Sequence, residues 1–157
     1  MLQAFSQQQN DAIENQLMNL LVKAEANAVY LCDRGGNIMA QKAAQAYAGE
    51  DNIAALASGS FYATRVLAEL LGEAEFRHAI HQGSNTSMYM QIMDCDLLIL
   101  VVFGQESNPG LVKLYCAEAC HAIDDMFGHQ PFNSTAMPAS NTVFELDSSR
   151  NPFQRAR

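Results

Sequence analysis

His78 and His81 are the first residues whose type and spacing suggest chemistry, because imidazole is a common ligand of transition metals. The surrounding residues 76–82 have the composition of a short strand. Side chains three residues apart in a strand point to opposite faces of the sheet, so one ion cannot easily be bound by both histidines. The spacing therefore does not favour a shared metal site.

Cys116, Cys120 and His121 form a second candidate metal set near the end of the chain's last helical segment. The two cysteines are four residues apart and share one helix face, but that face also carries apolar residues. Cys32 and Cys95 lie in apolar segments as well, without disulfide-framework spacing or a local signature of a nucleophile. We therefore predict four buried, free thiols, which suits a reducing compartment.

The motifs of nucleotide and acyl chemistry are absent from the sequence. No G-x-x-x-x-G-K-[ST] or G-x-S-x-G occurs, and the pair Gly35 and Gly36 lies between two strand-like segments rather than opening a helix. Glu69, Glu73 and Glu75 surround a helix end, where a solvated surface is the simplest interpretation. The sequence thus predicts that the protein is neither a GTPase nor another enzyme, and that it needs no cofactor or metal.

Composition narrows the classes of partner. The formal net charge of -8 opposes nucleic acid and anionic membranes, since both attract clustered Lys and Arg. The longest strongly apolar run, residues 97–103, is far shorter than the roughly 20 residues of a membrane span. The first residues have no basic start or cleavage site typical of a secretory signal, so we expect a cytoplasmic protein.

Hydrophobic periodicity and turn residues predict eight elements before residue 128. Helices are predicted at 11–24, 53–71 and 110–127, with Asp51 or Asn52 capping the second and Gly72 ending it. Strands are predicted at 28–32, 37–41, 76–82, 87–93 and 97–103. The order α-β-β-α-β-β-β-α predicts an α+β fold in which a five-stranded antiparallel sheet carries helices on both faces.

The second helix has more apolar surface than one sheet can cover. A projection at 100° per residue places one set of residues toward the sheet, namely Ile53, Ala57, Phe61, Thr64, Ala68 and Leu71, flanked by Leu56, Ser60 and Leu67. The far side holds Ala55, Gly59, Tyr62, Val66 and Leu70, beside a narrow polar stripe of Ser58, Arg65 and Glu69. Such a face predicts a protein interface, and its small residues, including Ala63, favour dimerisation through this helix. The alternative is a three-layer monomer that encloses the helix completely.

Residues 128–157 differ in composition from the body. They contain three of the four prolines and many Ser, Asn and Thr without a sustained period, so we expect a disordered C-terminal tail after a domain of residues 1–127. Two short apolar clusters interrupt the tail, one around Phe144 and Leu146 and one at Phe153.

Several segments, taken in order, resemble the roadblock family and, within it, the bacterial MglB proteins that regulate the Ras-like GTPase MglA. The segments are VYLCDRGGNIMA, LASGSFYATRVLAELLGEAEF, HQGSNTSMYMQI and LLILVVFGQESNPGLVKLY. The resemblance covers about residues 10 to 127 and rests on the order and spacing of the segments. It implies the profilin-like roadblock fold and a homodimer joined through the second helices and sheet edges.

The resemblance also implies a function. One Ras-like GTPase is expected to bind per dimer, and its GTP hydrolysis to be stimulated by repositioning of its switch regions without an inserted arginine finger. The implied GTPase contacts are Gly59, Tyr62 and Val66; the expected dimer contacts are Ala55, Gly59, Ala63 and Leu70; and the tail could add Phe144, Leu146 and Phe153.

Two other functions remain open at this point. The first is a roadblock scaffold or adaptor that binds a small GTPase or a multiprotein complex without altering hydrolysis. The second is a small-molecule sensor of profilin-like fold, which would need a cavity lined by convergent polar groups.

Overall fold

The computed structural model describes residues 5–131. Its element order is the predicted one: α1 Gln7–Lys23, β1 Ala28–Cys32, β2 Ile38–Ala43, α2 Glu50–Leu70, β3 His78–His81, β4 Ser87–Ile92, β5 Leu98–Phe103 and α3 Pro109–Met126. The expected tail contacts Phe144, Leu146 and Phe153 lie outside the described residues. Within those residues no helix is long and apolar enough to cross a membrane.

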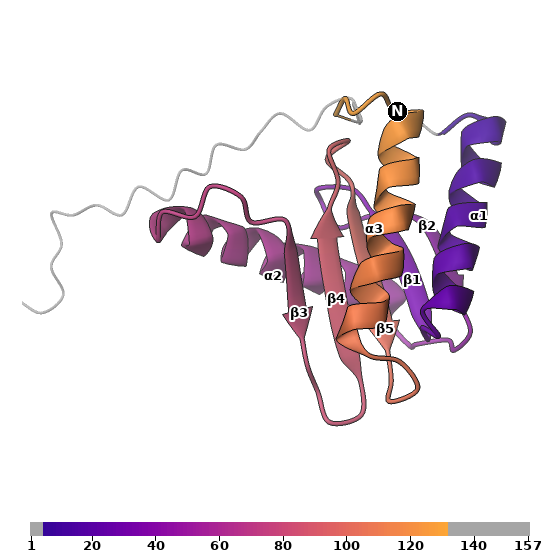
Figure 1. Ribbon diagram of the computed structural model, residues 1–157, viewed down its shortest axis with the longest axis horizontal. Coiled ribbons are helices and arrows are strands. Elements are labelled where there is room, and N and C mark those ends of the chain that lie inside the picture. Colours follow the sequence, from indigo (N-terminus) through magenta and orange to yellow (C-terminus); the bar gives the residue numbers. More distant parts are fainter. Residues whose placement is uncertain (1–4, 132–157) are drawn as a thin grey trace, which may run out of the picture.

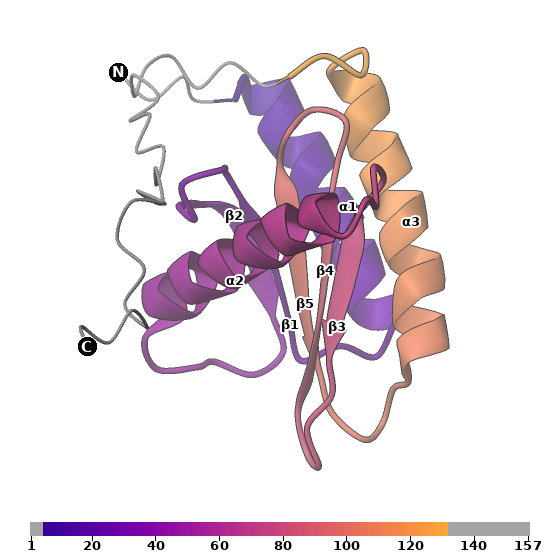
Figure 2. The same cartoon turned by 90° about the vertical axis from the view of Figure 1, so that its left-hand side faces the viewer.

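The five strands form one antiparallel sheet in the order β2-β1-β5-β4-β3. The helices α1 and α3 cover one face and α2 crosses the other (Figures 1 and 2). The central strands β1 and β5 are buried along their whole length, because each of their faces has a helix layer over it. The predicted α+β class and the two-sided helix arrangement are confirmed.

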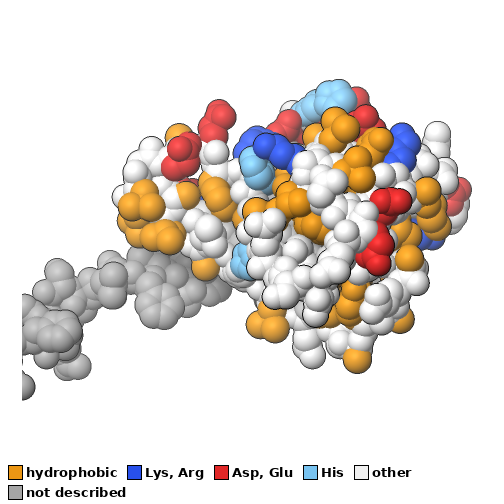
Figure 3. All heavy atoms as spheres, turned by 60° about the horizontal axis from the view of Figure 1, so that its bottom comes forward, with side chains coloured by type: hydrophobic (Ala, Val, Ile, Leu, Met, Phe, Trp, Pro, Cys, Tyr) orange, Lys and Arg blue, Asp and Glu red, His pale blue; other side chains and the backbone are white. Residues whose placement is uncertain are grey.

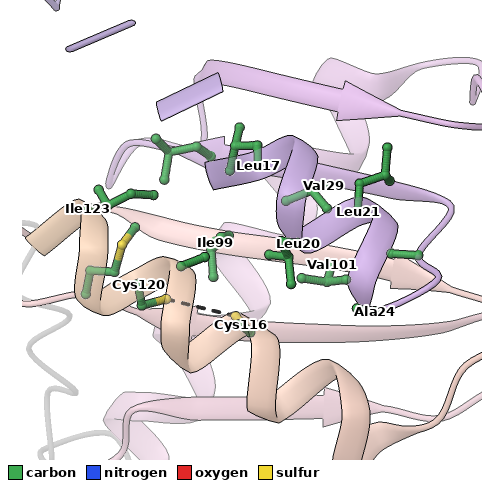
Figure 4. Packing of buried hydrophobic residues seen from close by; sticks show 14 of the residues in the cluster. Leu17, Leu20, Leu21, Ala24, Val29, Ile99, Val101, Cys116, Cys120 and Ile123 are labelled. Carbon is green, nitrogen blue, oxygen red and sulfur yellow. Dashed lines mark hydrogen bonds between the residues drawn. The ribbon is translucent and has the colours of Figure 1, made fainter. Parts of the chain in front are cut away.

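The larger core lies between the sheet and the α1–α3 layer. The predicted α1 stripe of Ile13, Leu17, Leu20 and Leu21 is buried there. Figure 4 shows this stripe meeting Ile99 and Val101 of β5 and residues of α3. The helix begins at Gln7 rather than at residue 11, because Ser6 forms a capping box with Gln9 in a polar segment that has no apolar period.

The four cysteines are buried and free, as predicted. The Sγ atoms of Cys116 and Cys120 lie 3.9 Å apart on the core side of α3 (Figure 4). Burial, with a smaller contribution from Asp33, raises the pKa of Cys32 to about 12. The Cys32 thiol is therefore a protonated core side chain without nucleophilic character.

The two ends of α2 differ in how well the sequence predicts them. The predicted cap at Asp51 or Asn52 is wrong: Gly49, with φ +76°, precedes the first turn and no side chain caps it. Acidic residues instead occupy the first turn, where the helix dipole favours negative charge. The C-terminal prediction is confirmed, since Gly72 has φ +86°, a conformation that favours glycine.

The buried face of α2 is rotated from the predicted one. Ser58, expected in the polar stripe, is only 2% exposed, whereas Leu71, expected against the sheet, is 78% exposed. The rotation arises because the β1–β2 hairpin packs on α2 beside Ser58, whose hydroxyl donates to the Arg34 carbonyl at 3.4 Å. The C-terminal end of α2 reaches beyond the sheet (Figure 1), which leaves Leu71 without a sheet partner.

Candidate functional site

The solvent side of α2 carries a line of apolar residues that we call the leucine stripe, defined as Leu56, Ala63, Leu67 and Leu70. Leu56 is 74% and Leu70 80% exposed. At 100° per residue these positions lie about opposite the buried Ala54, Ala57 and Phe61. Figure 3 shows hydrophobic side chains, with acidic ones beside them, on the projecting left-hand lobe that contains the end of α2. The described chain therefore does not enclose α2, contrary to the three-layer monomer alternative.

Small residues occupy the middle of this exposed side. Gly59 and Ala63 are exposed, and a Cβ atom built on Gly59 would meet nothing within 4 Å. Leu56, Ala63 and Leu70 are spaced seven residues apart, so they stay on one line along the helix. The stripe thus has large residues at its ends and space for a second backbone at its centre.

An apolar hollow of about 360 Å³ lies beside the first half of the leucine stripe. It is bounded by Leu56 and Ser60 of α2, by His81 of β3 and by Met88 and Met90 of β4. The stripe and the hollow are continuous because Leu56 belongs to both.

A second exposed region lies on the side of α2 that faces the hairpin, and we call it the hairpin-side patch, defined as Arg34, Tyr62 and Val66. The Arg34 guanidinium lies 5.6 Å from the centre of the Tyr62 ring and 3.5 Å from Asp96. Val66, one turn further along α2, is 56% exposed. The patch therefore combines a cation, an aromatic ring and an aliphatic side chain.

Tyr62 is more deeply seated than the sequence suggests. It is half-buried, its ring meets Phe61 edge-on at 5.7 Å, and its hydroxyl is buried. Burial raises the pKa of Tyr62 to about 12, Asp96 adds to the shift, and Arg34 opposes it. The expectation that Tyr62 lies wholly on the far side of α2 is therefore wrong, whereas Val66 does lie in solvent.

The hairpin tip that carries Arg34 is fixed by local bonds. The Asp33 carboxylate accepts hydrogen bonds from the backbone N–H groups of Gly35 and Asn37, both at 2.9 Å. Gly36 has φ +82°, and a Cβ atom there would approach the Ala55 Cα to 2.8 Å. Only glycine fits this close approach, which seats the tip on α2.

A polar hollow of about 700 Å³ lies near the start of α2 and bears on the sensor hypothesis. Its Glu50 carboxylate accepts hydrogen bonds from the Tyr30 hydroxyl at 3.3 Å and the Gln41 amide at 3.2 Å. The Glu50 and Gln41 side chains in the lining of this hollow are thus bonded within the protein.

His78 and His81 are the first and last residues of β3. His78 stacks on Tyr89 at 5.9 Å, on the face covered by α3, whereas His81 lines the hollow beneath α2. The two imidazoles occupy opposite faces, as predicted. Burial and Lys113 lower the pKa of His78, so its neutral form is favoured.

A cluster that the sequence does not reveal lies at the end of α3. One carboxylate oxygen each of Asp94 and Asp124 and one ring nitrogen of His129 lie within 4.8 Å of one another, close enough to hold a metal ion. They are already engaged: the His129 nitrogens contact Asp94 and Asp125, and the Asp124 carboxylate accepts from the backbone. The cluster is held together by its own hydrogen bonds and ion pairs.

Comparison with solved structures relates this geometry to known proteins. MglB of Myxococcus xanthus is 27% identical, with a TM-score of 0.73, over 81% of this chain and 95% of that one. The gliding protein MglB of Thermus thermophilus is 29% identical, with a TM-score of 0.73, over 78% and 93%. An MglB described as having a tetrameric arrangement is 28% identical, with a TM-score of 0.74 and the same coverage.

The fold itself is that of a roadblock/LC7 domain from Streptomyces avermitilis, which is 15% identical with a TM-score of 0.66 over 73% of this chain and 97% of that one. The chain has an MglB-like roadblock fold. No protein-family model and no curated protein sequence matches it. The resemblance noted in the sequence is thus confirmed by three-dimensional similarity.

Within this MglB-like fold, the expected site residues separate into two groups. Ala63 and Leu70 belong to the leucine stripe, and Tyr62 and Val66 to the hairpin-side patch. Gly59 lies between the two, whereas Ala55 lies under the hairpin at Gly36. Arg34 joins the hairpin-side patch through its contact with Tyr62, whereas the sequence shows only an arginine in the glycine-rich Asp-Arg-Gly-Gly-Asn turn and does not assign it to a contact site.

Proposed function

We propose that this chain is a regulatory homodimer that binds a bacterial Ras-like small GTPase and stimulates its GTP hydrolysis by repositioning the switch regions. The similarity to MglB structures and the unpartnered apolar side of α2 support the proposal. The role would be exercised in the cytoplasm, in the control of cell polarity and motility. The chain itself would provide no catalytic site.

The leucine stripe is the proposed dimer surface, and its exposure is the observation that carries the proposal. If two copies of α2 pack antiparallel about a two-fold axis at Ala63, Leu56 of each copy lies opposite Leu70 of the other. This follows because Leu56 and Leu70 are each seven residues from Ala63. Gly59 and Ala63 allow the backbones to approach closely. Each buried leucine contributes about 1.5–3 kcal/mol before the cost of association.

The apolar hollow supports the same arrangement. It lies beside Leu56, where the antiparallel packing would bring the projecting end of the second α2. Leu70 and Leu71 of that end are exposed and of a size to enter it. The MglB structure with a tetrameric arrangement shows that a similar chain self-associates.

The hairpin-side patch is the proposed GTPase surface, because it remains free beside the leucine stripe. Val66 and the Tyr62 ring supply apolar area, and Arg34 supplies hydrogen-bond donors at the edge. Arg34 is engaged with Asp96 and Tyr62 on the body of the protein, which suits a positioning contact rather than an arginine finger. The GTPase would then supply its own catalytic groups.

The alternative is a scaffold that uses the same patch without changing hydrolysis. A single-turnover assay separates the two functions: the purified chain is added to a GTP-loaded Ras-like GTPase encoded in the same genome, and released phosphate is followed. If the chain is an activator, phosphate is released faster, in proportion to the amount of complex formed. A scaffold forms the complex, detected by gel filtration, and leaves the rate unchanged.

A further inference from the structure

The chain turns back on itself directly after α3. Gly128 and His129 both have positive φ, +60° and +55°, and the His129 N–H donates to the Asp124 carbonyl at 3.0 Å. This turn directs the His129 imidazole between two carboxylates. Its Nδ1 lies 2.9 Å from Asp94, in the β4–β5 turn, and its Nε2 lies 3.0 Å from Asp125 of α3.

This geometry favours a proton on each ring nitrogen. A neutral imidazole has one N–H donor and one lone pair, so it can donate to only one of the two carboxylates. The other carboxylate would then face a lone pair. Imidazolium donates to both and neutralises one of the two negative charges, which makes it the form that matches the observed contacts.

The other charged groups around His129 come from five parts of the chain. Arg77, which precedes β3, pairs with Asp94, and His121 of α3 lies 3.6 Å from Asp125. Asp124 accepts from the backbone N–H groups of Asp94 and Cys95 at 3.1 and 2.8 Å. Arg65 of α2 and Asp96 line the same hollow as His129, and Arg34 pairs with Asp96. Two carboxylates bond the imidazole directly, and the His121 ring lies 6.1 Å from the His129 ring, centre to centre.

We propose that His129 is a protonation-dependent clasp that ties the end of α3 to the β4–β5 turn and releases it when the imidazole loses its proton. The clasp fixes the place where the chain continues beyond residue 131, because Pro131 lines the hollow of about 410 Å³ that contains Arg65, Arg77 and Asp94. Asp96 lines the same hollow and pairs with Arg34, so the departure point lies near the hairpin-side patch. The clasp itself does not depend on the proposed function.

The pH window follows from the directions of the pKa shifts. Hydrogen bonds to Asp94 and then Asp125 raise the pKa of His129, and His129 and Arg77 lower the pKa of Asp94. A group whose pKa is raised by folding contributes its full stabilisation at pH values below its pKa in the unfolded chain. This stabilisation is lost as the pH rises through the pKa of the group in the folded protein. The clasp is therefore closed in mildly acidic solution and opens on the alkaline side of the ordinary histidine range.

A nitroxide label at Gln130→Cys tests the clasp in the full-length protein, because Gln130 is exposed and the native thiols are buried. Electron paramagnetic resonance spectra are recorded from about pH 5 to about pH 9, on both sides of the histidine pKa. The label is expected to be restricted at low pH and to gain a fast component as the pH rises. With His129→Gln the fast component is present throughout.

His121→Gln is the comparison variant, because His121 also faces Asp125 and lies 6.1 Å from the His129 ring but belongs to α3 and does not contact Asp94. It should leave the pH dependence of the label in place. Proton NMR titration of the four histidines, each assigned by its His→Gln variant, gives a second readout. The pKa of His129 should exceed the ordinary histidine value and fall toward it in Asp94→Asn.

A label whose mobility is independent of pH, or whose pH dependence survives His129→Gln, would overturn the clasp. An ordinary His129 pKa that Asp94→Asn leaves unchanged would do so as well. Circular dichroism of each variant confirms that the fold is intact, and Asp94→Asn keeps the test available if His129→Gln does not fold.

Discussion

The Arg34 guanidinium lies 5.6 Å from the centre of the Tyr62 ring, and this contact joins the β1–β2 hairpin to the middle of α2. The two residues are 28 positions apart in the sequence. Their contact places a cation at the edge of an exposed apolar area, which neither element could form alone.

Removal of this cation should affect binding more than stability. An exposed cation–π contact contributes about 0.5–1 kcal/mol, and the ion pair with Asp96 is solvent-exposed and worth little. Arg34→Ala should therefore lower the melting temperature only slightly, while GTPase binding measured by calorimetry weakens. Arg34→Lys keeps the charge and should restore part of the affinity; equal binding by all three proteins would exclude Arg34 from the interface.

Gly36→Ala should destabilise the fold. The new Cβ atom would approach the Ala55 Cα to 2.8 Å at a φ of +82°, and the left-handed conformation alone costs a non-glycine residue about 1–2 kcal/mol. Urea denaturation should show a loss of at least that size. A variant as stable as the original protein would mean that the hairpin tip is not seated on α2.

Gly59→Ala is the matched comparison, because the added methyl group meets nothing within 4 Å. In an exposed helix interior, alanine is more favourable than glycine by about 1 kcal/mol. The fold of the single chain should therefore become more stable. The same methyl group would hinder close approach of a second α2. We therefore expect weaker self-association together with a more stable fold.

Asp124 should be sensitive to substitution. It is buried and accepts hydrogen bonds from two backbone N–H groups of the β4–β5 turn. Asp124→Ala leaves both donors without their partner, at a cost of about 1–3 kcal/mol per unsatisfied buried group. Asp125→Ala, on the exposed side of the same helix turn, is the control and should cost much less in the same denaturation experiment.

These expectations indicate which features the sequence can predict. The order of elements, the α1 stripe and the end of α2 at Gly72 depend on local periodicity and on glycine, so they are predictable. The rotation of α2 depends on the hairpin packing beside Ser58, a contact between residues 24 positions apart. The His129 cluster joins residues 35 positions apart, and no local pattern indicates it.

Self-association should depend on the leucine stripe. Leu70→Arg places a charge on the proposed interface, so sedimentation at micromolar concentration should show monomers where the original chain is a dimer. Leu114→Arg, at an exposed leucine of α3, is the control and should leave the dimer intact. A monomeric original chain, or a dimeric Leu70→Arg variant, would contradict the assigned interface.

The central claim is that the hairpin-side patch makes this chain an activator of a Ras-like GTPase. The most direct measurement is the single-turnover rate of GTP hydrolysis by that GTPase with the original chain and with Val66→Arg, whose side chain is exposed and can change without disturbing the core. The account predicts marked acceleration by the original chain, no hydrolysis by the chain alone, and loss of acceleration by Val66→Arg while dimer mass and circular dichroism stay unchanged. Acceleration that persists undiminished in a folded Val66→Arg dimer would contradict the assigned surface, and binding without any acceleration by the original chain would contradict activation itself.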